Sequence, residues 1–161
     1  MAIQNLWNIE ILTPDKGIVR SLPEAASASF KRMEFVTLSS GKVAALSGTD
    51  PAAATILGVV LHDAAVITDN PTLVFVPDPE CQFIGNIYHA TPSSAVTAVT
   101  DVGTNYGLVE VSDKVHVDKA DTTNTKVKIT DLDTRDAVGD RYGRVIFRID
   151  AAVLQTPGAV S

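Results

Sequence analysis

The feature that most limits what this chain can fold into is a series of short apolar runs separated by turn-forming residues. Each run has the length of a strand, and Gly, Pro or Asp recur between the runs about every ten residues. Val and Thr are abundant, whereas strong helix formers such as Glu, Lys, Gln and Met are sparse. The pattern predicts about eight to ten short strands in an all-β barrel or sandwich.

Several segments carry this prediction individually. Phe35–Leu38 and 43–46 flank a Ser-Ser-Gly-Lys turn, which is typical of a β-hairpin. Residues 56–61 form a continuous apolar run, as expected of a strand buried on both faces. Residues 91–103 are the best helix candidate, but their Thr and Val content allows at most a short helix. We expect further strands over residues 73–76, 82–88, 106–111, 114–118, 126–130 and 142–149.

The first 29 residues differ in character from the rest. Apolar and polar residues alternate over residues 3–12, a turn follows at residues 13–17, and an Ala/Ser-rich stretch without periodicity ends the segment. We therefore expect an extended N-terminal arm over 1–29, a β-barrel domain over 30–154 and a flexible C-terminal tail over 155–161.

The alternating part of this arm is the best candidate for an interaction site. An extended, partly apolar segment can pair with a sheet edge of its own domain, or add as a strand to a neighbouring chain. The pattern does not decide between these two possibilities. Tryptophan is enriched at interface hot spots, and this chain has one. The candidate interface residues are Ile3, Leu6, Trp7, Ile9 and Ile11. If the arm is separate, deleting residues 2–12 leaves a folded domain.

Charge and composition argue against several classes of partner. The formal net charge is −6, with 13 basic and 19 acidic residues, so we expect no nucleic-acid partner. We find no signal peptide and no apolar run long enough to span a membrane, so we expect no membrane partner and a cytosol-like compartment, unless the chain is exported within a larger particle. Cys81 is the only cysteine and is expected to be a small core residue.

Candidate chemical sites fail at identifiable positions. His62, His89 and His116 are spaced too widely for a local metal motif, and we expect each at a strand edge or turn. The segment 131–136 begins like a calcium loop, but Arg135 and Asp136 occupy positions that require Asp or Asn and Gly. We expect a hairpin loop there, with Arg135 and Arg141 neutralising the acids. No nucleophile or phosphate-loop motif is present, so we expect no catalytic residue, cofactor or metal, and no enzyme.

Four motifs resemble the head decoration, or capsid-cement, proteins of tailed bacteriophages. They are F-V-x-L-S-S-G-K-V from Phe35, I-L-G-V-V-L-H-D-A from Ile56, V-G-x-x-Y-x-L from Val102 and D-x-Y-G-R-V from Asp140. The likeness spans about residues 33–150. It implies a small β-barrel or β-tulip-like domain, with no catalytic or cofactor-binding residues.

The resemblance also implies a role and a location. Such proteins bind the major capsid protein on the outside of the capsid where capsomers meet, often as homotrimers and sometimes as dimers. They stabilise the expanded head against the pressure of packaged DNA. The chain would be made in the bacterial cytoplasm and reside on the virion. The alternatives are another virion β-subunit, of the tail or of head completion, and a small β-barrel ligand-binding protein or enzyme.

Overall fold

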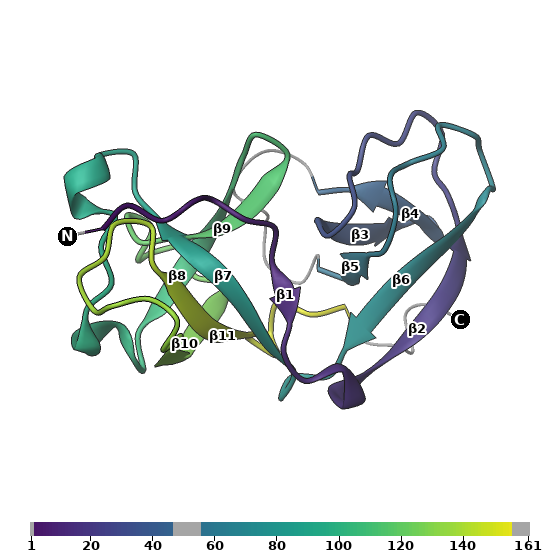
Figure 1. Cartoon of the computed structure of the whole chain (residues 1–161). Helices are drawn as coiled ribbons and strands as arrows, with labels where there is room; N and C mark the ends of the chain where they lie inside the picture. Colours follow the sequence, from purple (N-terminus) through teal and green to yellow (C-terminus); the bar gives the residue numbers. More distant parts are fainter. Residues whose placement is uncertain (1, 47–55, 156–161) are drawn as a thin grey trace.

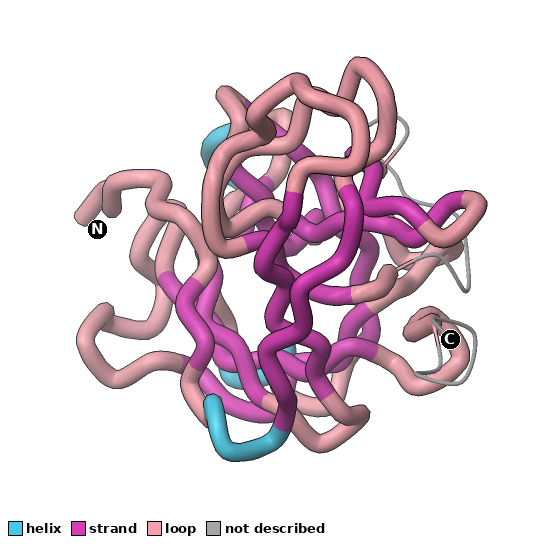
Figure 2. The backbone as a smooth tube through the Cα atoms, turned by 90° about the vertical axis from the view of Figure 1, so that its right-hand side faces the viewer, coloured by secondary structure: helices cyan, strands magenta, loops and turns pink. Residues whose placement is uncertain are grey.

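The all-β architecture expected from the sequence is confirmed. A computed structural model describes residues 2–46 and 56–155, and in these ranges the only helices are three single turns of 3-10 helix. Figure 2 shows them as short pieces between strands. The strands are β1 (Glu10–Ile11), β2 (Gly17–Pro23), β3 (Phe35–Ser39), β4 (Lys42–Ala45), β5 (Gly58–Val60), β6 (Pro71–Pro77), β7 (Gln82–Tyr88), β8 (Asn105–Val111), β9 (Lys114–Asp118), β10 (Val127–Leu132) and β11 (Arg144–Ile149); the 3-10 turns are η1 (Pro14–Lys16), η2 (Pro92–Ser94) and η3 (Val99–Asp101).

The strands form two lobes that lie side by side in Figure 1. The N-terminal lobe is a five-stranded sheet in the order β2-β6-β5-β3-β4, and a bridge between Glu24 and Val43 brings its two outer strands together. The sheet curls around a core of its own. The buried residues of this core are Leu22, Ala28, Phe30, Val36, Val43, Leu57, Val60, Val74 and Val76.

Local chemistry explains two details of this lobe. The hairpin between β3 and β4 turns at Ser40 and Gly41, which both have positive φ values of 50° and 76°, as in the turn that matches the twist of paired strands. Gly58 is required for a different reason. A Cβ atom there would lie 2.1 Å from the carbonyl oxygen of Phe75, so only glycine lets β5 and β6 approach this closely.

The C-terminal lobe is a closed barrel of five strands. Four antiparallel pairings run in the order β7-β11-β10-β8-β9, and a short parallel pairing between β9 and β7 closes the ring. That parallel pairing uses Ile87 and Tyr88 of β7. The earlier part of the same β7 edge, at Phe83 and Ile84, is paired instead with β1. Residues 10–11 therefore complete a strand edge that the barrel leaves free.

The two lobes share a hydrophobic core. The Phe83 ring of β7 lies 5.7 Å from Phe147 in its own lobe and 5.7 Å, edge-on, from Phe35 of the N-terminal lobe. Residues after β11 return to the N-terminal lobe, where Leu154 bridges Ile56. Because aromatic rings from both sheets interdigitate, the lobes are expected to unfold together.

Three boundary predictions need correction. Residues 17–29 are not part of a separate arm, because β2 pairs along its whole length with β6. The Ala/Ser-rich stretch shows no apolar periodicity, since only Leu22 and Ala28 of residues 21–29 are packed into the core of this lobe. The predicted single barrel over 30–154 is divided into two sheets. Gln155 is also not loose, because its side chain both donates to and accepts from the backbone of Leu38; residues 156–161 lie outside the described ranges.

The predicted helix over 91–103 is reduced to the two 3-10 turns η2 and η3. Its β-branched residues disfavour a longer helix, as the composition indicated. Among the described residues, no helix has the length and apolarity that crossing a membrane would need.

Candidate functional site

Residues 2–12, called the N-terminal segment below, lie along the C-terminal lobe and are held mainly through their backbone. Ala2 accepts a hydrogen bond from the N–H of Arg141 at 2.9 Å, and Gln4 donates its N–H to the Arg141 carbonyl at 2.8 Å. The Gln4 side chain donates to Asp140 at 2.9 Å, and the Lys114 ammonium donates to the Leu6 carbonyl at 3.1 Å. The segment is therefore fixed by contacts spread over its length.

Asn86, in the middle of β7, is the central anchor of this segment. Its side chain is fully buried, and its Oδ1 accepts the N–H of Trp7 at 2.7 Å. Its Nδ2 donates to the carbonyls of Asn5 at 2.9 Å and Tyr142 at 2.6 Å. One amide thus ties the N-terminal segment to both the barrel wall and the approach to β11. A buried polar group in this position is stable because its donors and acceptor are all paired.

The structure separates the five predicted interface residues. Ile9 is 2% exposed and belongs to the shared core, and Ile11 packs against that core. Leu6 is half-buried. Ile3 and Trp7 remain 63% and 52% exposed. Of the two possibilities that the sequence left open, the single chain shows pairing with its own sheet. Ile9 cannot contribute to an external surface while β1 stays paired.

The acidic loop between β10 and β11 is organised by arginines. Arg144 donates from Nε and Nη2 to both oxygens of Asp136 at 2.8 Å each, and Arg135 donates from Nε to Asp133 at 2.8 Å. The hydrogen bonds from Arg144 hold the pKa of Asp136 below its usual value. Burial opposes the same effect at Asp133, but the hydrogen bonds from Arg135 prevail and its pKa is also lowered. The predicted hairpin loop is present, with Arg144 rather than Arg141 as the second partner.

The same loop also contacts the N-terminal segment. The Arg135 guanidinium lies 3.2 Å from the Glu10 carboxylate, which extends the ionic network from the loop to β1. Both side chains are about half exposed, so this pair contributes little to stability.

The predicted histidine positions are correct at two of three residues. His62 accepts the N–H of Leu73, and His89 accepts the N–H of Thr91, both outside strands. His116 instead lies within β9, is fully buried and stacks on Tyr88 at 5.9 Å. Burial, together with the charge of Lys114, lowers the pKa of His116 to about 4, so the ring is neutral at physiological pH.

Cys81 is a buried core residue, as predicted. Its thiol lies beside the Thr13 hydroxyl, and burial raises its pKa. A thiol that is buried and protonated is a poor nucleophile.

A cleft of about 510 Å³ lies where η1 and the end of β6 meet the residues after β11. Its walls are largely apolar, with Ile18, Val76 and Leu154 among them, and its ionisable residues are Asp15 and Asp78. The described lining residues do not place a nucleophile next to a base, so the cleft offers no recognisable catalytic arrangement.

The structure brings together a group of three carboxylates that no sequence motif marks. Glu34, Glu110 and Asp113 come from different lobes, and one oxygen from each lies within 4.8 Å of the others. Glu34 is far in the sequence from Glu110 and Asp113, and the short spacing of those two acids does not by itself mark a site. The only available signal was Glu110, a charged residue two positions after the core residue Leu108 on the same face of a strand.

Comparisons with known proteins do not place the chain in a family. No family model, curated protein or solved structure matches it.

Proposed function

We propose that this protein is a non-catalytic structural module that decorates the outer surface of a tailed-phage head. The proposal combines the sequence resemblance with one structural observation: Trp7 is half exposed on a backbone held rigidly by Asn86. Ile3, also exposed, is held on the same segment by its bridge to Arg141. The major capsid protein is the proposed partner of these two side chains.

The physical advantage of this arrangement is pre-organisation. Ordering a flexible arm at the moment of binding costs conformational entropy for each residue fixed. Here the backbone of the N-terminal segment is already ordered by its own lobe, so an exposed Trp and Ile can be buried in a partner at lower cost. This differs from strand donation, because β1 stays on β7 and only side chains are offered.

Two general features fit this role. Subunits that occupy one lattice gain avidity, because each contact raises the effective concentration of the next. A protein that binds only the expanded head stabilises that state by mass action. Self-association into a homotrimer, or alternatively a dimer, would match the symmetry of capsomer junctions. The proposed oligomer is the homotrimer.

Location is the decisive test. Virions that carry this protein should be imaged by electron microscopy, and the mass of the purified protein should be measured in solution. Density on the capsid exterior, with a trimeric mass, supports the proposal. Density on the tail or at the portal vertex contradicts it and favours a tail or head-completion subunit instead.

Point variants then test the surface itself. Trp7→Ala combined with Ile3→Ser should weaken co-sedimentation with undecorated expanded heads by about tenfold or more, since interface aromatics are frequent hot spots. Ile67→Ser is the matched control, because Ile67 is 60% exposed and belongs to the N-terminal lobe. Equal binding by the double variant and the control would exclude the N-terminal segment as the contact surface.

A further inference from the structure

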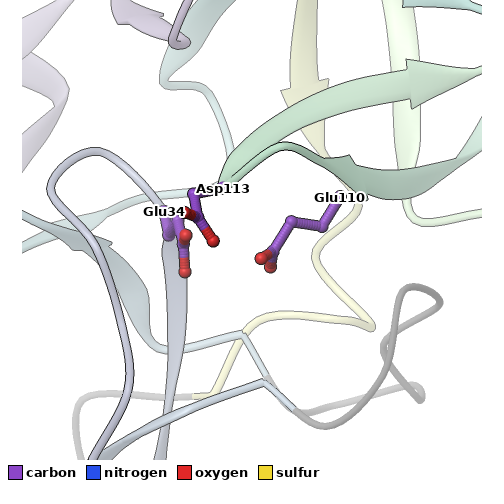
Figure 3. A group of neighbouring side chains, drawn as sticks. All are labelled: Glu34, Glu110 and Asp113. Carbon is purple, nitrogen blue, oxygen red and sulfur yellow. The ribbon is translucent and has the colours of Figure 1, made fainter.

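The three carboxylates of Glu34, Glu110 and Asp113 meet where the two lobes adjoin. Glu34 immediately precedes β3 of the N-terminal lobe, Glu110 is near the end of β8, and Asp113 is in the turn between β8 and β9. Figure 3 shows the three side chains turned toward a common space. The group lines a cleft of about 370 Å³, which also contains Ser29 and Ser112 and gives the site access to solvent.

Glu34 provides the observation that separates this group from an ordinary acidic surface. The residue is only 4% exposed, and its Oε1 is buried without a hydrogen-bond donor among the described residues. A buried carboxylate oxygen without a partner costs free energy. Because the Glu34 carboxylate also faces two further carboxylates, its surroundings favour a positively charged ligand.

The other two acids reinforce this conclusion. Glu110 shares the core-facing side of β8 with Leu108, a position where the pattern of the strand favours an apolar residue. Asp113 is held in a tight turn with Ser112, and both have positive φ values, of 62° and 53°. None of the ion pairs formed by the described residues includes Glu34, Glu110 or Asp113.

The raised pKa values of Glu34 and Glu110 agree with a site whose negative charges are not fully neutralised by nearby cations. Burial, followed by the charge of Glu110, raises the pKa of Glu34 to about 7, and the nearby Lys31 offsets this only in part. Burial and the charge of Asp113 raise the pKa of Glu110 as well.

We propose that Glu34, Glu110 and Asp113 bind a single calcium ion that links the two lobes. Carboxylate oxygens without His or Cys select a hard cation. Ca²⁺ binds oxygen at about 2.3–2.6 Å, so oxygens on opposite sides of one ion are about 4.6–5.2 Å apart. The separations within this group, 4.8 Å or less, therefore fit one ion with little rearrangement. The smaller Mg²⁺ requires shorter distances and a stricter octahedron, so it should bind more weakly.

An ion bound at this site would connect the sheets of the two lobes. Glu34 is fixed to the N-terminal lobe because its carbonyl accepts the N–H of Val60 at 3.0 Å. Glu110 and Asp113 belong to the β8–β9 hairpin of the barrel. One ion bound by all three carboxylates thus adds a cross-link between the two lobes, next to their shared core. The site is separate from the N-terminal segment, and the proposal does not depend on the proposed function.

Calorimetric titration of the full chain at pH 8, after removal of metals with EDTA, tests the proposal directly. We expect one Ca²⁺ per chain, weaker binding of Mg²⁺, and an increase of about 5 °C or more in the melting temperature in excess CaCl₂. Glu34→Gln should abolish both the binding heat and the thermal shift. Asp113→Asn, which changes an exposed turn, should weaken Ca²⁺ binding by about tenfold or more while the protein stays folded.

Asp131→Asn is the matched control, since Asp131 is an exposed acid of β10 and the first residue of the segment that begins like a calcium motif. It should keep the full calcium response. The proposal is wrong if the unaltered chain shows neither heat nor thermal shift, if both Glu34→Gln and Asp113→Asn respond like the unaltered chain, or if Mg²⁺ binds as tightly as Ca²⁺. Loss of the response only in Asp131→Asn would place the ion in the β10–β11 loop and also overturn it.

Discussion

The N–H of Trp7 donates a 2.7 Å hydrogen bond to the buried side chain of Asn86. This contact holds the backbone of Trp7, the one aromatic residue of the N-terminal segment, against the barrel. Asn86 also holds the carbonyls of Asn5 and Tyr142. Because Trp7 is the only tryptophan, its fluorescence reports on this contact without labelling.

Asn86→Ala should therefore destabilise the protein and release the segment. The substitution removes three hydrogen bonds and leaves their backbone partners without the Asn86 amide, so we expect a loss of about 2–4 kcal/mol in the free energy of unfolding. Urea denaturation gives this value, and a red-shifted Trp7 emission in the folded state would show that the segment has detached. Asn124→Ala, at an exposed side chain, should change stability by less than about 0.5 kcal/mol. Equal stability of the two variants would contradict the anchoring role.

Ile9 and Ile3 offer a test within one segment. Ile9→Ala should cost about 2–4 kcal/mol, because it opens a cavity in the shared core, whereas Ile3→Ala at a 63% exposed site should cost almost nothing. For the same reason, deleting residues 2–12 should destabilise the barrel rather than leave it intact. Thermal unfolding of the three proteins checks this order. Similar melting temperatures for Ile9→Ala and Ile3→Ala would mean that β1 is dispensable.

His116 should make the protein sensitive to mild acid. Its folded-state pKa of about 4 lies below the ordinary histidine value of about 6.5, so the unfolded chain binds the proton more readily. The contribution of His116 to stability is thus complete above about pH 6.5 and decreases by up to about 3 kcal/mol as the pH falls toward 4. The raised pKa of Glu34 acts in the opposite direction over the same range, so the slope due to His116 is obtained by comparing urea denaturation of the unaltered protein and of His116→Leu from pH 7 to pH 4. His116→Leu should reduce the slope, and an unchanged slope would exclude His116 as its source.

Asp136 should be the critical acid of the β10–β11 loop. Its side chain is 3% exposed and receives two hydrogen bonds from the Arg144 guanidinium. Asp136→Asn should cost about 3 kcal/mol, because it leaves the largely buried Arg144 guanidinium without its counter-charge. In the unaltered protein the lowered pKa of Asp136 means that its stabilisation is present above about pH 4 and is lost as the pH falls further.

Asp131→Asn, near the end of β10, should change stability by less than about 0.5 kcal/mol, since the Asp131 side chain is exposed. If urea denaturation at pH 7 gave a comparable loss of stability for Asp136→Asn and Asp131→Asn, the ion pair between Asp136 and Arg144 would not be the source of the stabilisation.

The sequence by itself determined the local elements. Apolar runs and turn chemistry predicted the β3–β4 hairpin, whose turn the structure places at Ser40 and Gly41, and a strand over the whole of β7 from Gln82 to Tyr88. These features depend on interactions between near neighbours in the chain, which a pattern of residues records directly. The burial of Cys81, and the fact that residues 2–46 and 56–155 contain only single turns of 3-10 helix, were predictable for the same reason.

The tertiary structure alone decided which surfaces meet. Period-two alternation shows that one face of a strand is buried, but it does not identify the sheet that buries it. The pairing of β2 with β6, the parallel contact that closes β9 on β7, and the burial of Ile9 in the shared core all depend on partners distant in the sequence. Glu34 and Glu110 approach each other only because two separate sheets pack together, so the proposed calcium site has no counterpart in any local motif.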